Sequence, residues 1–342
     1  MEDAQYQQAG QRLAGWTRTL VISHDRPDGD ALGAIGAAGR VIESQGRQAA
    51  ACTYGPVPPR YQFIETACGV SLWQPEQSAP LDDRFDGILI LDTCSWNQME
   101  PIAAALKSCR LPKVIIDHHA TRDDLTGQDS DDLYLIDATS ASACGMVHEL
   151  CRVMGWALDE AARDALFAGM ATDTGWFRFS NTDARTLAAA ADLVQQGVRP
   201  DVLYARLFET HRPARLHLKR EMLDTLQFHA DGKLALMWLT RPMYLLSDAT
   251  AADAEELVNE PLNVGSVIVS VLLSESEGGR IRVNLRSRAP EVAGRDIDVA
   301  EIARRWGGGG HRRAAGARIE GKLDEVRDLV RQAALDALSR RE

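Results

Sequence analysis

Short apolar runs alternate with stretches of helical periodicity up to about residue 185. The runs that predict strands lie at residues 19–23, 49–54, 87–91, 113–116 and 133–136. Continuous apolar runs of this length are typical of strands that are covered on both faces. Between and after them, helical periodicity predicts helices at residues 30–45, 141–154, 159–171 and 183–196. This alternation predicts an α/β fold in which a mostly parallel sheet is flanked by helices.

The pattern changes after about residue 200. A charged helical stretch at 201–227, broken near Arg212 and Pro213, is interpreted as a connector. Beyond it, strands are predicted at 233–239, 266–274 and 280–285, with helices at 247–259, at 298–306 and from 323. The predicted organisation is a first domain at 1–195, a helical connector at 196–228 and a smaller α/β domain at 229–342.

The net charge of the chain bears on whether its partner is a long nucleic acid. The chain has 342 residues and a net charge of −11, with 49 acidic against 38 basic side chains. Proteins that bind long nucleic acids usually present positive charge to the phosphates, so a long nucleic acid is not expected as a partner. A small phosphate ligand is compatible with the acidic net charge, because bound cations can make the electrostatic potential of a site positive.

The location expected from the sequence is the cytoplasm. The N-terminal ten residues are polar, and no apolar run approaches the ~20 residues that a membrane span needs, so no membrane partner is expected. The six cysteines show no Cys-x-x-Cys pair and are interpreted as small core residues in a reducing compartment.

Acidic and imidazole side chains follow several of the predicted strands. The first strand is followed by a loop with His24, Asp28 and Asp30, and the strand at 87–91 by Asp92. The next strand leads into Asp117-His118-His119, and Asp173 follows the helix at 159–171. Because ligands gather outside the carboxyl ends of parallel strands, we expect these side chains to converge.

Carboxylates and imidazoles without thiolates suit a hard or borderline divalent ion, Mn²⁺ first, with Mg²⁺ or Co²⁺ also compatible. The number of ligands suggests two ions that Asp92 could bridge. Singly, each motif has a plainer interpretation, Asp30 as a helix cap and the histidine pair as a surface feature. Their combination in one α/β chain favours a two-metal centre that hydrolyses phosphate esters.

At these residues the sequence resembles the DHH/DHHA1 phosphoesterase family, in its nano-RNase and pAp-phosphatase branch. The matching segments are 24–33, 91–92, 117–119, 173–175, 285–288 and 307–316, in family order. The resemblance spans about 15 to 335. It implies an N-terminal DHH catalytic domain, a smaller DHHA1 substrate domain and a cleft between them.

The resemblance also implies roles for individual residues. On the first metal it places His24, Asp28 and Asp92, and on the second Asp30, Asp92, His118 and Asp173. His119 would face the scissile phosphate as a hydrogen-bond donor or proton source. Asp117 would orient an imidazole by accepting its other N–H.

In the second domain, Arg286 and Arg288 lie at a strand end, where guanidinium forks suit phosphate oxygens, and Ser287 could donate beside them. Four glycines follow the helix predicted at 298–306, although a simple helix cap needs one. Such a run allows backbone amides to approach an anion. The substrate-binding set expected on this loop is Gly308, Gly309, Gly310, His311 and Arg312.

Arg312 and Arg313 stand where relatives usually have Lys and Asn, which keeps positive charge but leaves the base and length preference open.

The leading hypothesis is metal-dependent hydrolysis of short oligoribonucleotides and of 3′-phosphoadenosine 5′-phosphate (pAp), with water activated between the metals. The second domain would hold another phosphate of the substrate and so limit its length.

An alternative in the same family is a phosphodiesterase for cyclic or linear dinucleotides. A pyrophosphatase or exopolyphosphatase is disfavoured by the Arg286 and glycine-loop pattern, and a non-catalytic nucleic-acid-binding module by the full set of metal ligands. The oligomeric state, a homodimer included, is left open.

Overall fold

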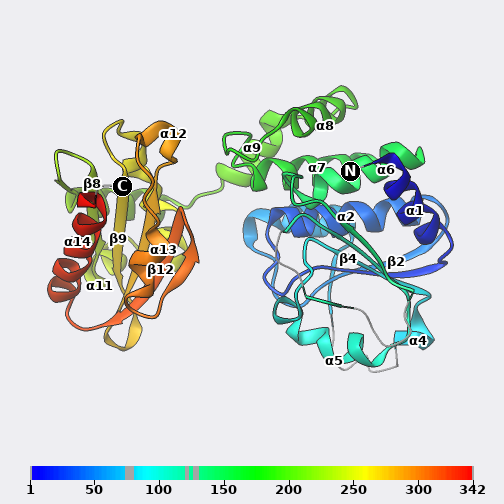
Figure 1. The fold of residues 1–342 in the computed structure, drawn as a ribbon, viewed down its shortest axis with the longest axis horizontal. Coiled ribbons are helices and arrows are strands. Elements are labelled where there is room, and N and C mark those ends of the chain that lie inside the picture. The colour runs from blue at the N-terminus through cyan, green and yellow to red at the C-terminus, as the bar shows by residue number, and fades with distance from the viewer. Residues whose placement is uncertain (1, 74–80, 120–122, 126–130, 341–342) are drawn as a thin grey trace. The chain divides into compact units, whose positions relative to one another are not determined.

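The computed structural model describes residues 2–73, 81–119, 123–125 and 131–340, which form two compact units, Met1–Thr210 and His211–Glu342 (Figure 1). The division falls inside the predicted connector. Helix α9 (Pro200–Phe208) therefore belongs to unit 1, and α10 (Pro213–Asp224) to unit 2.

Unit 1 is built on a six-stranded sheet of order β3-β2-β1-β4-β5-β6, in which every pairing is parallel. Its strands are β1 (Arg18–Ile22), β2 (Gln48–Thr53), β3 (Ser71–Leu72), β4 (Gly87–Leu91), β5 (Lys113–Asp117) and β6 (Leu133–Ile136). The predicted α/β class is confirmed. The chain runs outward from β1 in one direction and then returns to its other side at β4, so the order reverses between β1 and β4. In open parallel sheets this reversal is where ligands bind.

Helices cover both faces of this sheet. They are α1 (Asp3–Ala14), α2 (Gly29–Ser44), α3 (Gln62–Cys68), α4 (Leu81–Arg84), α5 (Glu100–Ser108), α6 (Ala143–Met154), α7 (Glu160–Asp173) and α8 (Ala184–Gln195), with 3₁₀ turns η1 (Pro59–Tyr61) and η2 (Trp96–Gln98). Figure 1 shows α2, α6 and α7 on one side and α4 and α5 on the other. Alternate residues of β4 enter two separate cores, Leu89 on the α2 side and Ile88 on the α5 side.

Helix α2 packs very closely on α6 and α7 because glycine occupies the contact. A Cβ added at Gly33 would lie 2.4 Å from the carbonyl oxygen of Ala165, and one at Gly169 would lie 2.2 Å from Cys144 Sγ. This packing brings the N-termini of α2 and α6 and the C-terminus of α7 together.

Unit 2 contains a second six-stranded sheet, of order β11-β12-β10-β9-β8-β7, in which only the β8–β9 pair is parallel. Its strands are β7 (Gln227–His229), β8 (Leu234–Leu239), β9 (Val269–Glu275), β10 (Arg280–Ser287), β11 (Gly309–His311) and β12 (Ala314–Glu320). Its helices are α11 (Arg241–Leu246), α12 (Pro290–Ala293), α13 (Val299–Arg304) and α14 (Leu323–Ser339), with 3₁₀ helices η3 (Ala251–Ala254), η4 (Leu257–Asn263) and η5 (Glu277–Gly279).

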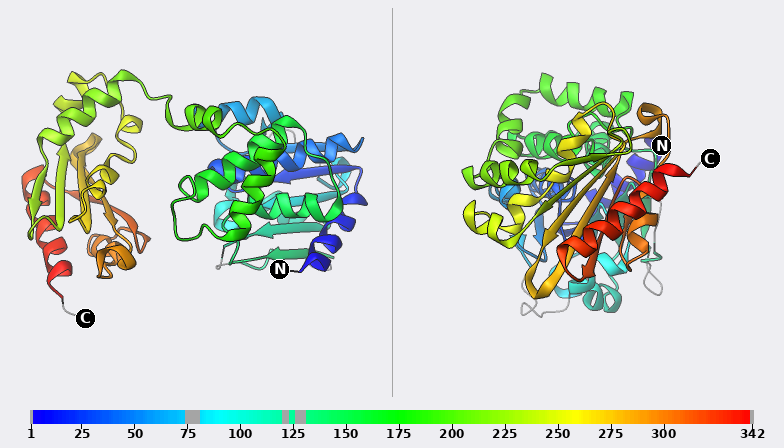
Figure 2. Two further views of the ribbon diagram at one scale, coloured as in Figure 1. Left: turned by 90° about the horizontal axis from the view of Figure 1, so that it is seen from above. Right: turned by 90° about the vertical axis from the view of Figure 1, so that its left-hand side faces the viewer.

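The two faces of this sheet are covered unequally. Helices α13 and α14 bury the apolar side chains of one face, and Figure 2 shows α14 lying across it. On the other face, α10 and η4 pack on β8 and β9, and side chains of β10 and β12 line cavities.

The predicted helix at 247–259 is wrong. Helix α11 ends before it, and the segment forms the short helices η3 and η4 instead. Glu256 adopts a left-handed backbone (φ 64°), which an α-helix cannot contain. The elements that were not predicted are strands β3, β7, β11 and β12 and helices α1, α3, α4, α5, α11 and α12. No described helix is long and apolar enough to cross a membrane.

Candidate metal centre and phosphate-binding site

The acidic and imidazole side chains of unit 1 lie at the reversal of strand order. His24 follows β1, Asp92 follows β4 directly, and Asp117 ends β5. The carboxyl ends of these three neighbouring strands share one edge of the sheet. The strand-end pattern in the sequence therefore corresponds to one place in the structure.

Ligand atoms at this edge form three overlapping groups, in each of which all atoms lie within 4.8 Å of one another. The groups are His24, Asp28, Asp92; Asp30, His118, Asp173; and Asp92, His118, His119. All six residues predicted as metal ligands are thus brought together, and Asp92 belongs to two groups. Their donor atoms are carboxylate oxygens and imidazole nitrogens, which suit a divalent cation.

Asp92 occupies the centre of this arrangement. Its side chain is 3% exposed, with Oδ1 3.2 Å from His118 Nε2 and Oδ2 3.4 Å from His24 Nε2. Among the described residues, Oδ1 has no hydrogen-bond partner of acceptable geometry. Its backbone is left-handed (φ 59°), a conformation that Asp and Asn tolerate better than most residues. A buried carboxylate oxygen without a donor is costly, and a cation would remove that cost.

The two acids of the first loop have different neighbours. Asp28 caps α2, because its Oδ1 accepts from the backbone N–H groups of Asp30 (3.0 Å) and Ala31 (3.1 Å). Asp30 instead accepts from the first amides of α6, those of Ala143 (2.6 Å) and Cys144 (2.8 Å). Burial, together with the neighbouring carboxylates, raises the pKa of Asp30.

His118 is held with one nitrogen facing the acids. Its Nδ1 lies 3.3 Å from the carbonyl oxygen of Ser140, so Nδ1–H can donate there. Its Nε2 then faces Asp30 and Asp173, each at 3.7 Å, as well as Asp92. A donating Nδ1–H of this kind is typical of metal-binding histidines.

Protonation is shifted strongly in this cluster. Burial opposes the charged form of His118, but the surrounding carboxylates, Asp92 first, raise its pKa to about 10. Burial raises the pKa of Asp173 to about 6. Both shifts follow from crowding acids in a buried site without metal.

His119 lies at the exposed side of the cluster, with Nδ1 3.8 Å from Oδ1 of Asp92. Its Nδ1 lies 2.8 Å from Oδ1 of the buried Asp117, which also accepts from the His119 backbone N–H at 3.2 Å. The hydrogen bond to Asp117 raises the pKa of His119. The side chain is 50% exposed, so Nε2 is the ring nitrogen left for a ligand.

These groups line a cavity of about 410 Å³. Four further residues that we did not predict as functional also line it, namely Asp25, Arg26, Asn97 and Gln98. Arg26 lies on the loop between His24 and Asp28, which was the signal available in the sequence. Asn97 and Gln98 belong to η2, whose position depends on the loop after β4 and leaves no such signal.

In unit 2, Arg286 lines a cavity of about 520 Å³ with glycines of the 307–309 run. The Arg286 guanidinium donates to the carbonyl oxygen of Leu285 at 3.0 Å. Burial lowers the pKa of Arg286. A partly buried guanidinium at a cavity wall suits a phosphate oxygen.

Comparison with known proteins gives the family of both units. The model of the DHH family, N-terminal domain, matches residues 18–170, and that of the DHHA1 domain matches residues 241–336. The chain belongs to the DHH/DHHA1 family. The resemblance stated from the motifs is confirmed.

Several relatives of the chain span nearly its full length. It is 29% identical over 323 residues to the bifunctional oligoribonuclease and PAP phosphatase NrnA of Thermus thermophilus, covering 94% of this chain and 90% of the relative. It is 26% identical over 305 residues to the protein of the same name from Bacillus subtilis, covering 88% and 89%. An exopolyphosphatase-related protein from Bacteroides fragilis has the same fold, with a TM-score of 0.84 at 22% identity, covering 98% of this chain and 96% of that one.

Two residues of the expected substrate set in the DHHA1 domain are bonded to its backbone. Ser287 is buried and its hydroxyl donates to the carbonyl oxygen of Ile297 at 2.7 Å. Arg288 donates to the carbonyl oxygens of the 262–265 segment, including that of Val264 at 2.9 Å. These contacts hold the strand end in place. Arg312 forms an ion pair with Asp296, and His311 lies exposed on β11.

The glycine run serves the backbone in several ways. Gly307 (φ 67°) lies in the turn that follows α13, and the N–H of Gly308 donates to the carbonyl oxygen of Ala303 at 3.0 Å. A Cβ at Gly308 would lie 2.2 Å from the carbonyl oxygen of Gly316, and Gly310 has a φ of 136°. The run is thus a helix end followed by a close strand approach. The amide of Gly308 is already bonded, which limits its part in an anion nest.

Proposed function

We propose that this DHH/DHHA1 protein is a metal-dependent phosphoesterase that hydrolyses short oligoribonucleotides and pAp. The observation that carries the proposal is the buried Asp92 carboxylate, whose oxygens lie 3.4 Å from Nε2 of His24 and 3.2 Å from Nε2 of His118, one histidine of each proposed ligand set. The full-length similarity to proteins named oligoribonuclease and PAP phosphatase supports the substrate class. The acidic net charge of −11 fits small rather than long polyanions.

In this proposal the cluster holds two divalent ions, for which Mn²⁺ suits the mixed oxygen and imidazole donors. One ion would take His24, Asp28 and Asp92, and the other Asp30, Asp92, His118 and Asp173. The four carboxylates would then balance the charge of two divalent ions. When bound, the ions would supply Lewis acidity and lower the pKa of a water that acts as nucleophile.

His119 is proposed as the residue that donates a proton or hydrogen bond to the phosphate or to the leaving oxygen. Its Nδ1 is bonded to Asp117, so Nε2 is the ring nitrogen that would face the substrate. Asp117 fixes the ring and favours the protonated imidazole, so it acts by positioning His119.

The DHHA1 domain is proposed to bind another phosphate of the substrate through Arg286, with His311 and Arg312 contributing exposed donors. Gly308 and Gly310 would contribute by allowing the close approach of β12, and Gly309 by leaving room for the ligand. Ser287 and Arg288 are proposed to shape this site through their backbone contacts. Six buried cysteines, none in a disulfide, agree with a cytoplasmic location.

One assay tests the proposed function. Purified full-length protein with Mn²⁺ is given RNA of two and five nucleotides, pAp and a cyclic dinucleotide, side by side. We expect hydrolysis of the RNAs and pAp, and complete loss when a chelator is added. Preference for the cyclic dinucleotide would favour the alternative phosphodiesterase, and no hydrolysis of any substrate would overturn the proposal.

A further inference from the structure

The sheet of unit 2 presents a row of polar side chains opposite its core. Successive residues of a strand point to opposite faces, so Ile281, Val283 and Leu285 of β10 enter the core of α13 and α14. Arg282, Asn284 and Arg286 therefore lie on the other face. On β12, the equivalent positions are Ala314, Gly316 and Arg318.

Two arginines of this face oppose each other directly. Arg282 of β10 pairs with Arg318 of β12 in the antiparallel register. Like charges at opposed positions destabilise a sheet. Neither guanidinium has an ion pair or hydrogen bond with a residue in the described part of the chain. The charge of Arg282 also adds to burial in lowering the pKa of Arg286.

The cavity of about 520 Å³ gathers these charges. Arg282, Arg286 and Arg318 line it, and none of its lining residues is acidic. The small residues Ala314 and Gly316 form part of its lining and leave space over β12. An anion is the ligand that three guanidinium groups around a cavity without acidic lining residues would stabilise.

A second cavity, of about 680 Å³, adjoins the first. Arg282, Asn284, Arg286 and Arg318 line both cavities. The second is also lined by Tyr244 and Leu245, which offer an aromatic and an apolar surface. Its acidic residues are Glu255, Glu256 and Glu275, against four arginines that include Arg241.

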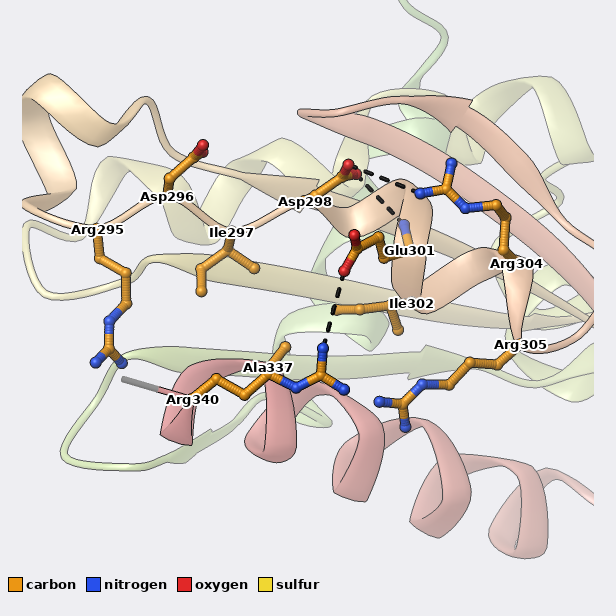
Figure 3. Close-up of a pocket in the computed structure, with 10 residues that line it drawn as sticks. All are labelled: Arg295, Asp296, Ile297, Asp298, Glu301, Ile302, Arg304, Arg305, Ala337 and Arg340. Atoms are coloured by element: carbon orange, nitrogen blue, oxygen red, sulfur yellow. Dashed lines mark hydrogen bonds and ion pairs between the residues drawn. The ribbon is translucent and has the colours of Figure 1, made fainter. Parts of the chain in front are cut away.

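Another arginine-rich cavity of unit 2, of about 410 Å³, provides a contrast. In it, Arg304 pairs with Asp298 and Arg340 with Glu301, as Figure 3 shows. Arg305, which also lines it, pairs with Asp336. In that cavity, three arginines each form an ion pair with a carboxylate. Arg282 and Arg318, in contrast, form no ion pair with any residue that the structure describes.

We propose that Arg282 and Arg318 form a second phosphate-binding position beside that of Arg286, so that the DHHA1 domain binds two phosphates of one oligonucleotide. The substrate class rests on the proposed function. Arg282 and Arg286 are four residues apart, roughly 13 Å along the strand. Asn284 lies between them and can bond a sugar or base.

Substrate length follows from this arrangement. If one phosphate of pAp is the scissile one, only one phosphate is left for the DHHA1 domain, and Arg286 suffices. An oligonucleotide of five residues has further phosphates besides the scissile one and the one at Arg286, and one of these would bind to Arg282 and Arg318. The pair would therefore raise affinity for oligonucleotides selectively.

The test compares full-length R282A and R318A with the parent protein. With Mn²⁺, we expect the KM for a five-nucleotide RNA to rise about tenfold in each variant while kcat is unchanged. The KM for pAp should change by less than about twofold. Binding of the same RNA in chelator, measured without turnover, should weaken to a similar degree and lose about one unit of salt slope per arginine.

Controls separate the outcomes. R220A removes an exposed arginine of α10 that lines neither cavity, and should leave both KM values unchanged. Neither R282A nor R318A should lower Tm, because each removes one of two opposed like charges. Unchanged RNA binding, or equal losses for RNA and pAp, would overturn the second position. Arginine-dependent binding in chelator without any hydrolysis in Mn²⁺ would instead overturn the proposed function alone.

Discussion

At the scale of single residues, Asp92 combines burial, a left-handed backbone and an unpartnered oxygen. Asn tolerates the same backbone as Asp, whereas Ala adds conformational strain. Asp92→Asn is therefore the variant that removes the charge without disturbing the turn.

We expect Asp92→Asn to lower turnover by at least about a hundredfold, because a shared ligand is lost from both proposed ions. Metal content, measured by mass spectrometry after dialysis, should fall with it while Tm in chelator stays close to the parent value. A variant that keeps more than about a tenth of the activity would rule out a bridging carboxylate.

Asp117 acts on His119, and this predicts a shift in the pH profile. The hydrogen bond to Asp117 raises the pKa of His119, so Asp117→Asn should lower that pKa. If protonated His119 is needed, activity falls as pH rises through its pKa, and the alkaline limb of kcat should move to lower pH in the variant. An unmoved limb would exclude His119 as the titrating group.

Ligands bind outside the carboxyl ends of parallel strands, so site residues at strand ends can be predicted once the ends of the strands are known. His24, Asp92 and His118 were found in this way. The hydrogen bonds of Ser287 and Arg288 could not be predicted from the sequence, because their acceptors are backbone carbonyls of other segments. The carbonyls that hold Arg288 belong to the 262–265 segment, next to the wrongly predicted helix at 247–259.

At the scale of elements, close contact of α2 with α6 and α7 fixes where Asp28 and Asp30 lie. Gly33 allows this contact, since a Cβ there would lie 2.4 Å from the carbonyl oxygen of Ala165 and 2.8 Å from Cys144 Sγ. Backbone cannot yield as a flexible side chain can, so α2 would have to move.

Gly33→Ala should therefore destabilise the protein by about 1–3 kcal/mol, as overpacked cores do. It should also weaken Mn²⁺ binding by displacing the N-terminus of α2. Gly265→Ala is the matched control, because nothing lies within 4 Å of a Cβ at that position. Denaturant unfolding and metal titration check both. Equal stability of the two variants would show that α2 packing does not need glycine.

The strands of unit 1 could be predicted from the sequence more fully than those of unit 2. In unit 1, buried parallel strands such as Gly87–Leu91 are continuous apolar runs and could be recognised. In unit 2, β12 reads Ala-Ala-Gly-Ala-Arg-Ile-Glu, where small residues carry little apolar signal. Its pairing with β10 depends on residues about 30 positions away, which local periodicity does not report.

At the scale of the whole molecule, metal binding should be coupled to protons. Without metal, the pKa of His118 is raised to about 10 and that of Asp173 to about 6. At pH 7 His118 is protonated and must lose its proton to bind an ion, so at least one proton should be released per chain. Affinity should fall from pH 7 to about pH 5 as Asp173 also becomes protonated.

Calorimetric titration with Mn²⁺ in buffers of different ionisation enthalpy measures this release directly. The apparent binding enthalpy should depend on the buffer, with a slope of at least one proton. A slope of zero would mean that His118 is not a ligand.

In the proposed metal centre, two divalent ions bind at the edge of the unit 1 sheet with Asp92 between them. Anomalous diffraction from Mn²⁺-soaked crystals tests it most directly. We expect two peaks about 3.5–4 Å apart, with the Asp92 carboxylate contacting both. A single peak, no peak, or ions held without Asp92 would contradict the account.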